Sequence, residues 1–168
     1  GVLHGSAPPT ISVVPNFVDV SKIPFSERNV SDLNKFLIVG RLTDQKNIGA
    51  LIAALTPEQS LTVIGEGEQR DVLQRMASDL RKNVLWLGRQ DHANVLQAMA
   101  DHDLFILPSR YEGMPKVVIE AMASGIPVLV SDAPGNRDVV RHGENGFLCG
   151  LSADSLAGSI RSIKENRE

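Results

Sequence analysis

The stretch that decides the fold of this chain runs from Leu107 to Ser131 and reads LPSRYEGMPKVVIEAMASGIPVLVS. An apolar run ends at Leu107, a segment bounded by two prolines follows, a segment with helical spacing comes next, and a second apolar run leads to Ser131. This order predicts a strand, a tight turn, a helix and a second strand in succession. Chemistry is expected at the turn, because open α/β sheets bind their ligands at the carboxyl ends of the strands.

The turn and the start of the predicted helix can bind an anion or a hydroxyl group. Pro115 suits a first helical position, where its missing N–H would have no partner in any case. Gly113 allows the backbone to approach a ligand closely. Unpaired amide donors at the positive end of the helix are expected from Met114, Lys116 and Val117.

Two carboxylates flank this helix start. Glu112 lies in the turn, and Glu120 follows eight residues later in the second helical turn. Both side chains can reach one cleft, where two acceptors would hold a ligand through its hydroxyls, and vicinal diols suit carboxylates. The alternative for an isolated pair of glutamates is a turn residue and a solvated helix position, because glutamates are mostly exposed.

Length and composition describe one globular domain. The 168 residues are 42% hydrophobic and 22% charged, which excludes a disordered chain. A net charge of −3 disfavours a dedicated nucleic-acid surface. No apolar run approaches the roughly 18 residues of a membrane-spanning helix, and no signal peptide is recognised. The single cysteine, Cys149, is expected to be a core thiol, and no spacing of histidines or cysteines suggests a metal site.

From Lys35 onward, short apolar runs alternate with segments of helical spacing. This pattern predicts a doubly wound, Rossmann-like α/β domain, with three α/β/α layers and a parallel sheet covered on both faces. Strands are expected at 36–39, 61–64, 84–87, 104–107, 128–130 and 147–149. Helices are expected at 48–55, 68–80, 92–100, 116–123, 137–140 and 153–164. Residues 1–34 are expected to form an irregular connector with a short apolar run at 11–14.

The central stretch resembles a known signature. The pattern Glu-Gly-Met-Pro-x-x-x-x-Glu-Ala-Met-Ala-Ser-Gly-Ile-Pro-Val, which begins at Glu112, is similar to the Glu-x7-Glu motif of retaining GT-B glycosyltransferases of family four, the glycosyl transferases group 1. The resemblance covers the chain from about residue 13 to its end. It includes the segments VVPNFVD at 13–19, GRLTDQKN at 40–47, IGEGE at 64–68 and HGENGFL at 142–148.

Three departures from the family pattern are visible. Phe17 and Asn47 stand where the family usually has glycine. Pro134 and Gly135 replace a glycine pair, and Asp138 stands in for a glutamate. The loop at Pro134 could therefore offer fewer backbone donors than in the family, because proline has no N–H.

The resemblance implies one half of a GT-B fold. Residues 35–168 would form the nucleotide-sugar-binding domain, and residues 1–34 would connect it to an absent N-terminal acceptor domain. The full protein would transfer a hexosyl group from a UDP- or GDP-sugar to a glycan or lipid-linked acceptor, with retention of configuration and without a metal or other cofactor. This chain alone is expected to be inactive. A cytoplasmic location is expected, with peripheral association of the full-length protein at the cytoplasmic face of the membrane.

Roles for individual residues also follow from the resemblance. Arg41 and Lys46 would stabilise the departing diphosphate, and the alternative for them is a solvated loop with two basic residues. Glu112 would contact the hexose and Glu120 the ribose diol. The expected donor-binding residues are Gly40, Gly65, Gly67, Gly88, Arg89, Gly113, Met114, Lys116, Val117, Val118 and Glu120. Two other functions stay open: a sugar-nucleotide epimerase on the same fold, and a binding module without chemistry of its own.

Overall fold

The computed structural model describes residues 17–25 and 33–165. Six parallel strands form one sheet in the order β3-β2-β1-β4-β5-β6. The strands are β1 (Lys35–Val39), β2 (Ser60–Ile64), β3 (Asn83–Gly88), β4 (Leu104–Leu107), β5 (Val128–Ser131) and β6 (Phe147–Cys149). All six predicted strands are confirmed, and no end differs by more than one residue.

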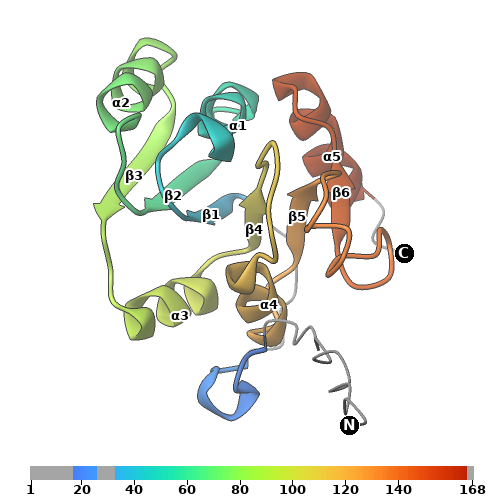
Figure 1. Ribbon diagram of the computed structural model, residues 1–168. Helices are drawn as coiled ribbons and strands as arrows, with labels where there is room; N and C mark the ends of the chain where they lie inside the picture. Colours follow the sequence, from blue (N-terminus) through green and yellow to red (C-terminus); the bar gives the residue numbers. More distant parts are fainter. Residues whose placement is uncertain (1–16, 26–32, 166–168) are drawn as a thin grey trace, which may run out of the picture.

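Helices cover both faces of the sheet. They are α1 (Ile48–Ala54), α2 (Arg70–Asp79), α3 (His92–Asp101), α4 (Lys116–Ala123) and α5 (Ala153–Glu165), with short 3₁₀ helices η1 (Val20–Lys22) and η2 (Asp44–Lys46). Figure 1 shows α1, α2 and α5 on one face and α3 and α4 on the other. The predicted doubly wound α/β architecture is confirmed. No helix in the described ranges is long and apolar enough to cross a membrane.

The sheet separates two apolar cores. Phe36 and Ile38 of β1 face the core under α1, α2 and α5, whereas Leu37 between them faces the core under α3 and α4. Because a central parallel strand is buried on both faces, it is apolar at almost every position, and β4 and β5 are buried along their whole length. Cys149 lies in the core under α1, α2 and α5 and is a core thiol, as predicted.

The arrangement of the crossovers places the site. From β1 the chain proceeds to β2 on one side, and from β4 it proceeds to β5 on the other, so the winding reverses between the neighbouring strands β1 and β4. In open α/β sheets the ligand binds at such a point, beyond the carboxyl ends of the strands. The turn after Leu107 therefore lies where the sequence places the chemistry.

Residues 137–140, predicted as a helix, instead form turns. Arg137 N donates to Ala133 O (3.2 Å) and Val140 N to Asn136 O (2.8 Å), but these are single helical turns that do not propagate. Gly135 has a φ of 80°, which turns the chain just before this segment. So short a segment cannot support a helix alone, because nucleation is unfavourable.

α2 begins at Arg70 and not at Glu68. The expected start at residue 68 is therefore two residues too early: Glu66 and Glu68 precede the helix, and Asp71 is the acid in its first turn. Glu66 instead forms an ion pair with Arg70. The loop is held to the end of β1 by a hydrogen bond from Leu42 N to Glu66 O (2.9 Å).

The sheet is less covered at one edge than the sequence suggests. β3 is an edge strand, and its Leu85 and Leu87 are 55% and 40% exposed. Trp86, between them, points to the opposite face and packs against the core under α1, α2 and α5. The two leucines therefore lie on the part of the sheet that α3 leaves open.

Residues 17–25, which belong to the expected connector, pack against the domain. Ile23 joins the core under α3 and α4. η1 is capped by Asp19, whose carboxylate accepts from Ser21 N at 3.2 Å. The short apolar run expected at 11–14 lies outside the described residues.

Candidate functional site

Two adjoining hollows open at the carboxyl ends of β1, β2 and β4. The larger has a volume of about 750 Å³ and is lined by Val39, Gly40, Arg41, Thr43, Asp44, Gln45, Lys46, Glu68, Arg110, Tyr111 and Val117. The second has a volume of about 410 Å³ and is lined by Val39, Gly40, Arg41, Ile64, Gly65, Glu66, Arg89, Gln90 and Val95. Because Val39, Gly40 and Arg41 line both, the two form one cleft around the end of β1.

The loop after β1 meets the loop after β4. Lys46 Nζ lies 2.5 Å from Glu112 Oε1, and the side chains are only 15% and 10% exposed. Gln45 reinforces the contact, because its carbonyl accepts from Arg110 N (2.8 Å) and its side-chain amide donates to Tyr111 O (2.8 Å). Lys46, expected to bind the diphosphate, and Glu112, expected to bind the hexose, therefore form an ion pair with each other. Because both side chains are largely buried, solvent screens their attraction less than that of a surface pair.

Asn47 explains one departure from the family pattern. It has φ 53° and ψ 33°, in the left-handed region, which glycine adopts freely and asparagine tolerates better than most residues. Its side-chain amide donates to Leu151 O at 2.9 Å. The loop that carries Lys46 therefore keeps the turn that a glycine would allow, and gains a link to the segment before α5.

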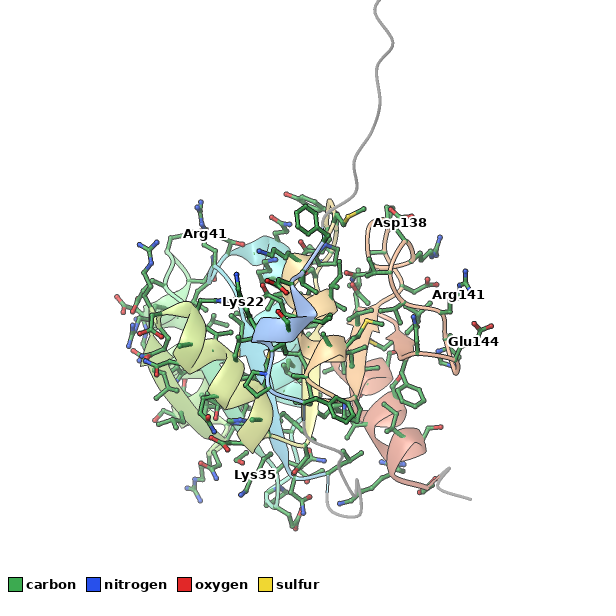
Figure 2. All side chains as sticks on the ribbon, turned by 90° about the horizontal axis from the view of Figure 1, so that it is seen from below. Lys22, Lys35, Arg41, Asp138, Arg141 and Glu144 are labelled. Atoms are coloured by element: carbon green, nitrogen blue, oxygen red, sulfur yellow. The ribbon has the colours of Figure 1, made fainter. Side chains whose placement is uncertain are left out.

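Two arginines are free to meet an anion. Arg41 and Arg89 are exposed, both line the smaller hollow, and neither side chain is paired with any residue of the described ranges. In Figure 2, Arg41 extends into solvent at the edge of the molecule opposite Lys35, which starts β1. Arg110, also at the cleft, differs because Asp44 neutralises it at 3.2 Å.

The start of α4 differs in detail from expectation. Pro115 is the N-cap (φ −76°, ψ 89°), and Lys116 is the first helical residue. Val118 N donates to Pro115 O (3.0 Å) and its side chain is fully buried, so Val118 has no donor to offer a ligand. The amides of Lys116 and Val117 bond to no described residue. They are the two donors that the helix start presents to an anion.

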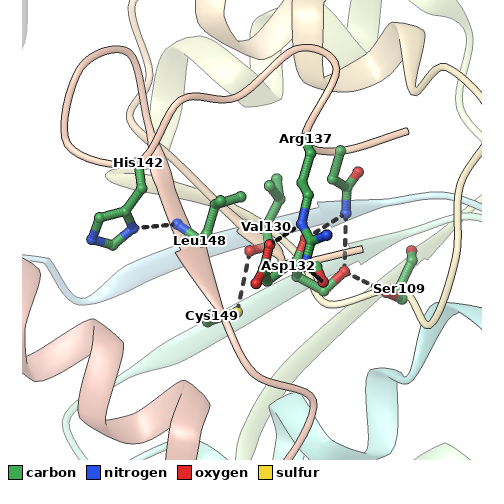
Figure 3. Close-up of polar contacts among 9 residues, drawn as sticks. Ser109, Val130, Asp132, Arg137, His142, Leu148 and Cys149 are labelled. Carbon is green, nitrogen blue, oxygen red and sulfur yellow. Dashed lines mark hydrogen bonds and ion pairs between the residues drawn. The ribbon is translucent and has the colours of Figure 1, made fainter. Parts of the chain in front are cut away.

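A buried polar network supports the turn that carries Glu112. Ser131 Oγ donates to Ser109 O, and Asn136 Nδ2 donates to Ser131 O (3.0 Å) and to Ser131 Oγ (2.9 Å) (Figure 3). Gly135, beside Asn136, packs so closely that an added Cβ would lie 2.1 Å from Gly113 O. Sequence reasoning missed Asn136 and Ser131, because nothing local distinguishes a buried asparagine in a Pro-Gly loop from an exposed one.

Gly113 itself is unobstructed. A Cβ added there would meet no atom within 4 Å. The packing of the protein therefore does not require a glycine at this position. The open space fits the expected approach of a ligand to this backbone. By contrast, a Cβ on Gly65 would lie 1.9 Å from Gly40 O, so that glycine is required by the contact between two loops.

Glu120 is not a solvated helix residue. It is buried, and His92 Nε2 of α3 lies 3.1 Å from its Oε1. Lys116 Nζ lies 3.7 Å from the same oxygen. Because burying a charge is costly unless the charge is paired, these two partners between α3 and α4 offset the burial of this carboxylate.

The remaining expected donor-binding residues lie in three different places. Gly40, Gly65, Arg89 and Val117 line the cleft together with Arg41 and Lys46. Gly67 and Gly88 do not line either hollow: they pack against Leu42 O and the Glu66 side chain, respectively. Met114 joins the turn to α4 and is half-buried.

The titratable groups beyond β5 serve the structure. Arg137 forms a hydrogen bond with Asp132, lowers the pKa of that carboxyl and has its own pKa raised in return (Figure 3). Burial raises the pKa of the Cys149 thiol to about 12. His142 Nδ1 accepts from Leu148 N at 2.9 Å. Among the described residues, no three side chains of His, Cys, Asp or Glu are grouped as metal ligands.

The fold and the cleft define a class of protein: an open Rossmann-like α/β domain with a cleft lined by cationic side chains at its switch point, like one half of the GT-B fold. The chain belongs to the family Glycosyl transferases group 1, whose profile matches residues 19–168.

Three known proteins illustrate the similarity. UDP-Gal:alpha-D-GlcNAc-diphosphoundecaprenol alpha-1,3-galactosyltransferase of Escherichia coli is 34% identical over 95% of this chain and 46% of its own length. Glycogen synthase of Mycobacterium tuberculosis is 32% identical over 98% of this chain and 42% of its own. The structure of Anabaena HepE in complex with UDP-glucose has a TM-score of 0.73 and 30% identity, over 82% of this chain and 40% of that one. The chain thus spans less than half the length of these proteins.

Proposed function

We propose that this chain is the nucleotide-sugar-binding domain of a hexosyltransferase that uses a UDP- or GDP-sugar. The observation that carries the proposal is the convergence of Arg41, Lys46 and the free amides of Lys116 and Val117 on one edge of the sheet. The relatives support it, because one is named for UDP-Gal and one is described with UDP-glucose.

The charges fit the departure of a diphosphate. When the bond between the sugar and the nucleoside diphosphate breaks, negative charge grows on the diphosphate, and an enzyme must place cations and amide donors there in advance. Arg41 pairs with no side chain of residues 17–25 or 33–165, and two parallel N–H groups of its guanidinium suit a phosphate. Lys46 adds an ammonium close by, and the helix start of α4 adds two amides and the positive end of its dipole. In this proposal these groups stabilise the leaving group without a metal.

The two glutamates divide the rest of the donor between them. Glu112 lies in the turn that Lys46 reaches, so we assign it the hexose, next to the diphosphate. Glu120 lies in the second turn of α4, eight residues after Glu112, and we assign it the ribose diol. A carboxylate can accept from two neighbouring hydroxyls at once, which gives each glutamate a chemical reason for its place.

The proposal for the whole protein goes further. An N-terminal domain would bind a glycan or lipid-linked acceptor across the cleft, and transfer would retain the configuration of the sugar. Peripheral attachment to the cytoplasmic face of a membrane belongs to the same proposal. Its support is the resemblance of the Glu112–Glu120 motif to retaining enzymes, and a relative named for a diphosphoundecaprenol-linked substrate.

Calorimetry with UDP, GDP and the free nucleosides tests the domain's role. Arg41→Ala should weaken the preferred diphosphate by about 10- to 100-fold, the cost of one charge-assisted hydrogen bond, and should change nucleoside binding little. Arg161→Ala, an exposed arginine of α5, is the matched control and should have no effect. Equal losses for the diphosphate and the nucleoside would remove Arg41 from the diphosphate site.

A further inference from the structure

A contact between α3 and α4 holds one oxygen of Glu120. The Glu120 side chain is 9% exposed, and its Oε1 lies 3.1 Å from His92 Nε2 and 3.7 Å from Lys116 Nζ. Both contacts fall on Oε1, and no residue of the described ranges bonds to Oε2. One half of the carboxylate is therefore satisfied inside the protein, and the other half is left for a ligand.

His92 is the partner that fixes the direction of this carboxylate. The 3.1 Å contact is a hydrogen-bond distance, whereas the 3.7 Å contact of Lys116 is a charge interaction without hydrogen-bond geometry. Since an ionised carboxylate only accepts, the imidazole must donate through Nε2–H. Lys116 is also a mobile point charge, and its side chain is 58% exposed.

The backbone that carries His92 is well anchored. His92 is the first residue of α3, and its N-cap is Asp91, whose carboxylate accepts from Asn94 N at 2.8 Å. The side chain is 62% exposed, and its Nε2 reaches across to Glu120 of α4. A capped helix start is a firm base from which a side chain can orient another.

The contact lies beside the cleft, three residues along each helix from a residue that lines it. Val95, one turn after His92, lines the smaller hollow, and Val117, one turn before Glu120, lines the larger one. The bridge between His92 and Glu120 therefore joins the two helices whose first turns border the two hollows.

We propose that His92 is a positioning residue for ribose recognition: by holding Oε1 of Glu120, it directs Oε2 toward the ribose diol of the nucleotide. The inference rests on the proposed function, because it needs Glu120 to bind the ribose. It adds a residue outside the Glu112–Glu120 motif. Without the imidazole, the carboxylate can rotate about its last side-chain bond, and the diol would lose a fixed acceptor.

The test is calorimetry with a nucleoside diphosphate and its 2′-deoxy form, using UDP and 2′-deoxy-UDP or GDP and 2′-deoxy-GDP, whichever base the wild type binds more tightly. The wild type should prefer the ribonucleotide by about tenfold or more, the size of one hydrogen bond to a charged group. His92→Phe keeps a ring but no donor, and should reduce this preference to about twofold or less. His92→Gln places an amide N–H near the position of Nε2 and should restore most of it.

Controls separate positioning from folding and from failure of the proposed function. Asn94→Ala changes an exposed residue of the same helical turn and should keep the wild-type preference. A His92→Phe protein that keeps the wild-type preference, or that loses affinity for both nucleotides equally, overturns the role of His92 while leaving the ribose assignment of Glu120 intact. A wild type that binds both forms equally overturns that assignment, and this inference with it.

Discussion

At the scale of single residues, the ion pair between Lys46 and Glu112 changes what each is expected to do. Both side chains are largely buried, and their 2.5 Å separation means that the free domain already neutralises the lysine. A diphosphate that binds Lys46 must either bind beside Glu112 or displace Glu112 from the lysine. The two roles inferred for the diphosphate and the hexose are therefore coupled by electrostatics.

A neutral substitution at Glu112 should expose this coupling. Glu112→Gln keeps the shape of the side chain but frees the charge of Lys46, so affinity for UDP should stay the same or rise, by up to about tenfold. The additional affinity of UDP-glucose over UDP should fall, because the hexose loses a charged acceptor. Calorimetry with both ligands measures the two effects.

The exposed Glu144→Gln is the control for loss of a negative charge. It should leave both affinities unchanged. If Glu112→Gln weakened UDP as much as UDP-glucose, Glu112 would act on the nucleotide or on the fold, and the division of roles between the two glutamates would be wrong.

The residue types at the cleft could be predicted from sequence, but their pairing could not. The charged loop at 40–47 and the turn at 107–115 each carry a recognisable pattern. Lys46 and Glu112 are 66 positions apart, and only the β1–β4 pairing brings them together. The buried Asn136 escaped prediction for the same reason, since tertiary packing alone decides its burial.

At the scale of elements, α3 is fixed at both ends by polar contacts. Asp91 caps its start, and His102 closes its end with two bonds: one to Ala98 O (2.6 Å) and one to Thr62 Oγ1 of β2 (2.7 Å). A carbonyl only accepts, so His102 Nδ1 carries the proton, and the neutral ring accepts at Nε2 from the Thr62 hydroxyl. Because burial disfavours a charge on the ring, the uncharged imidazole is the favoured form in this arrangement.

The pH dependence of stability should reveal His102. Burial lowers its pKa below the usual value, although the neighbouring carboxylates of Asp101 and Asp103 oppose this effect. Between the two pKa values the unfolded chain binds more protons than the folded one. The stabilisation is therefore fully present above about pH 6.5 and is lost as pH falls through the folded-state pKa.

Urea unfolding at pH 7.5 and 5.5 measures this effect. His102→Asn keeps a donor for Ala98 but does not titrate, so the drop in unfolding free energy between the two pH values should be smaller than in the wild type. Asn94→Ala, at the other end of α3, should keep the wild-type drop. An undiminished drop in His102→Asn would mean that other groups account for the acid sensitivity.

Elements differ in how well sequence predicts them. Continuous apolar runs indicate parallel strands reliably here, because strands buried on both faces have no polar alternation to confuse the pattern. Helix ends are less certain: the acidic Glu66 and Glu68 look like a helix start, yet their loop is held by Leu42 and the helix begins at Arg70. The turns at 137–140 mimic helical spacing without the length to sustain a helix.

At the scale of the whole molecule, the fold places cations, amides and carboxylates from three separate loops at one point. Only a sheet whose winding reverses between β1 and β4 brings the loops after these strands into one cleft. The sequence predicts this layout through alternation of strands and helices. It does not predict the open face of β3 at Leu85 and Leu87, because the path of α3 across the sheet is set by packing.

The most direct test of the central claim is to map UDP-glucose binding on the backbone amides of this chain by NMR. The account predicts the largest shifts at Gly40, Arg41, Lys116 and Val117, around the cleft, with GDP-mannose as the second ligand if UDP-glucose does not bind. Shifts centred on the separate hollow of about 400 Å³ that Met122 and Phe147 line, or no binding of either ligand, would contradict it.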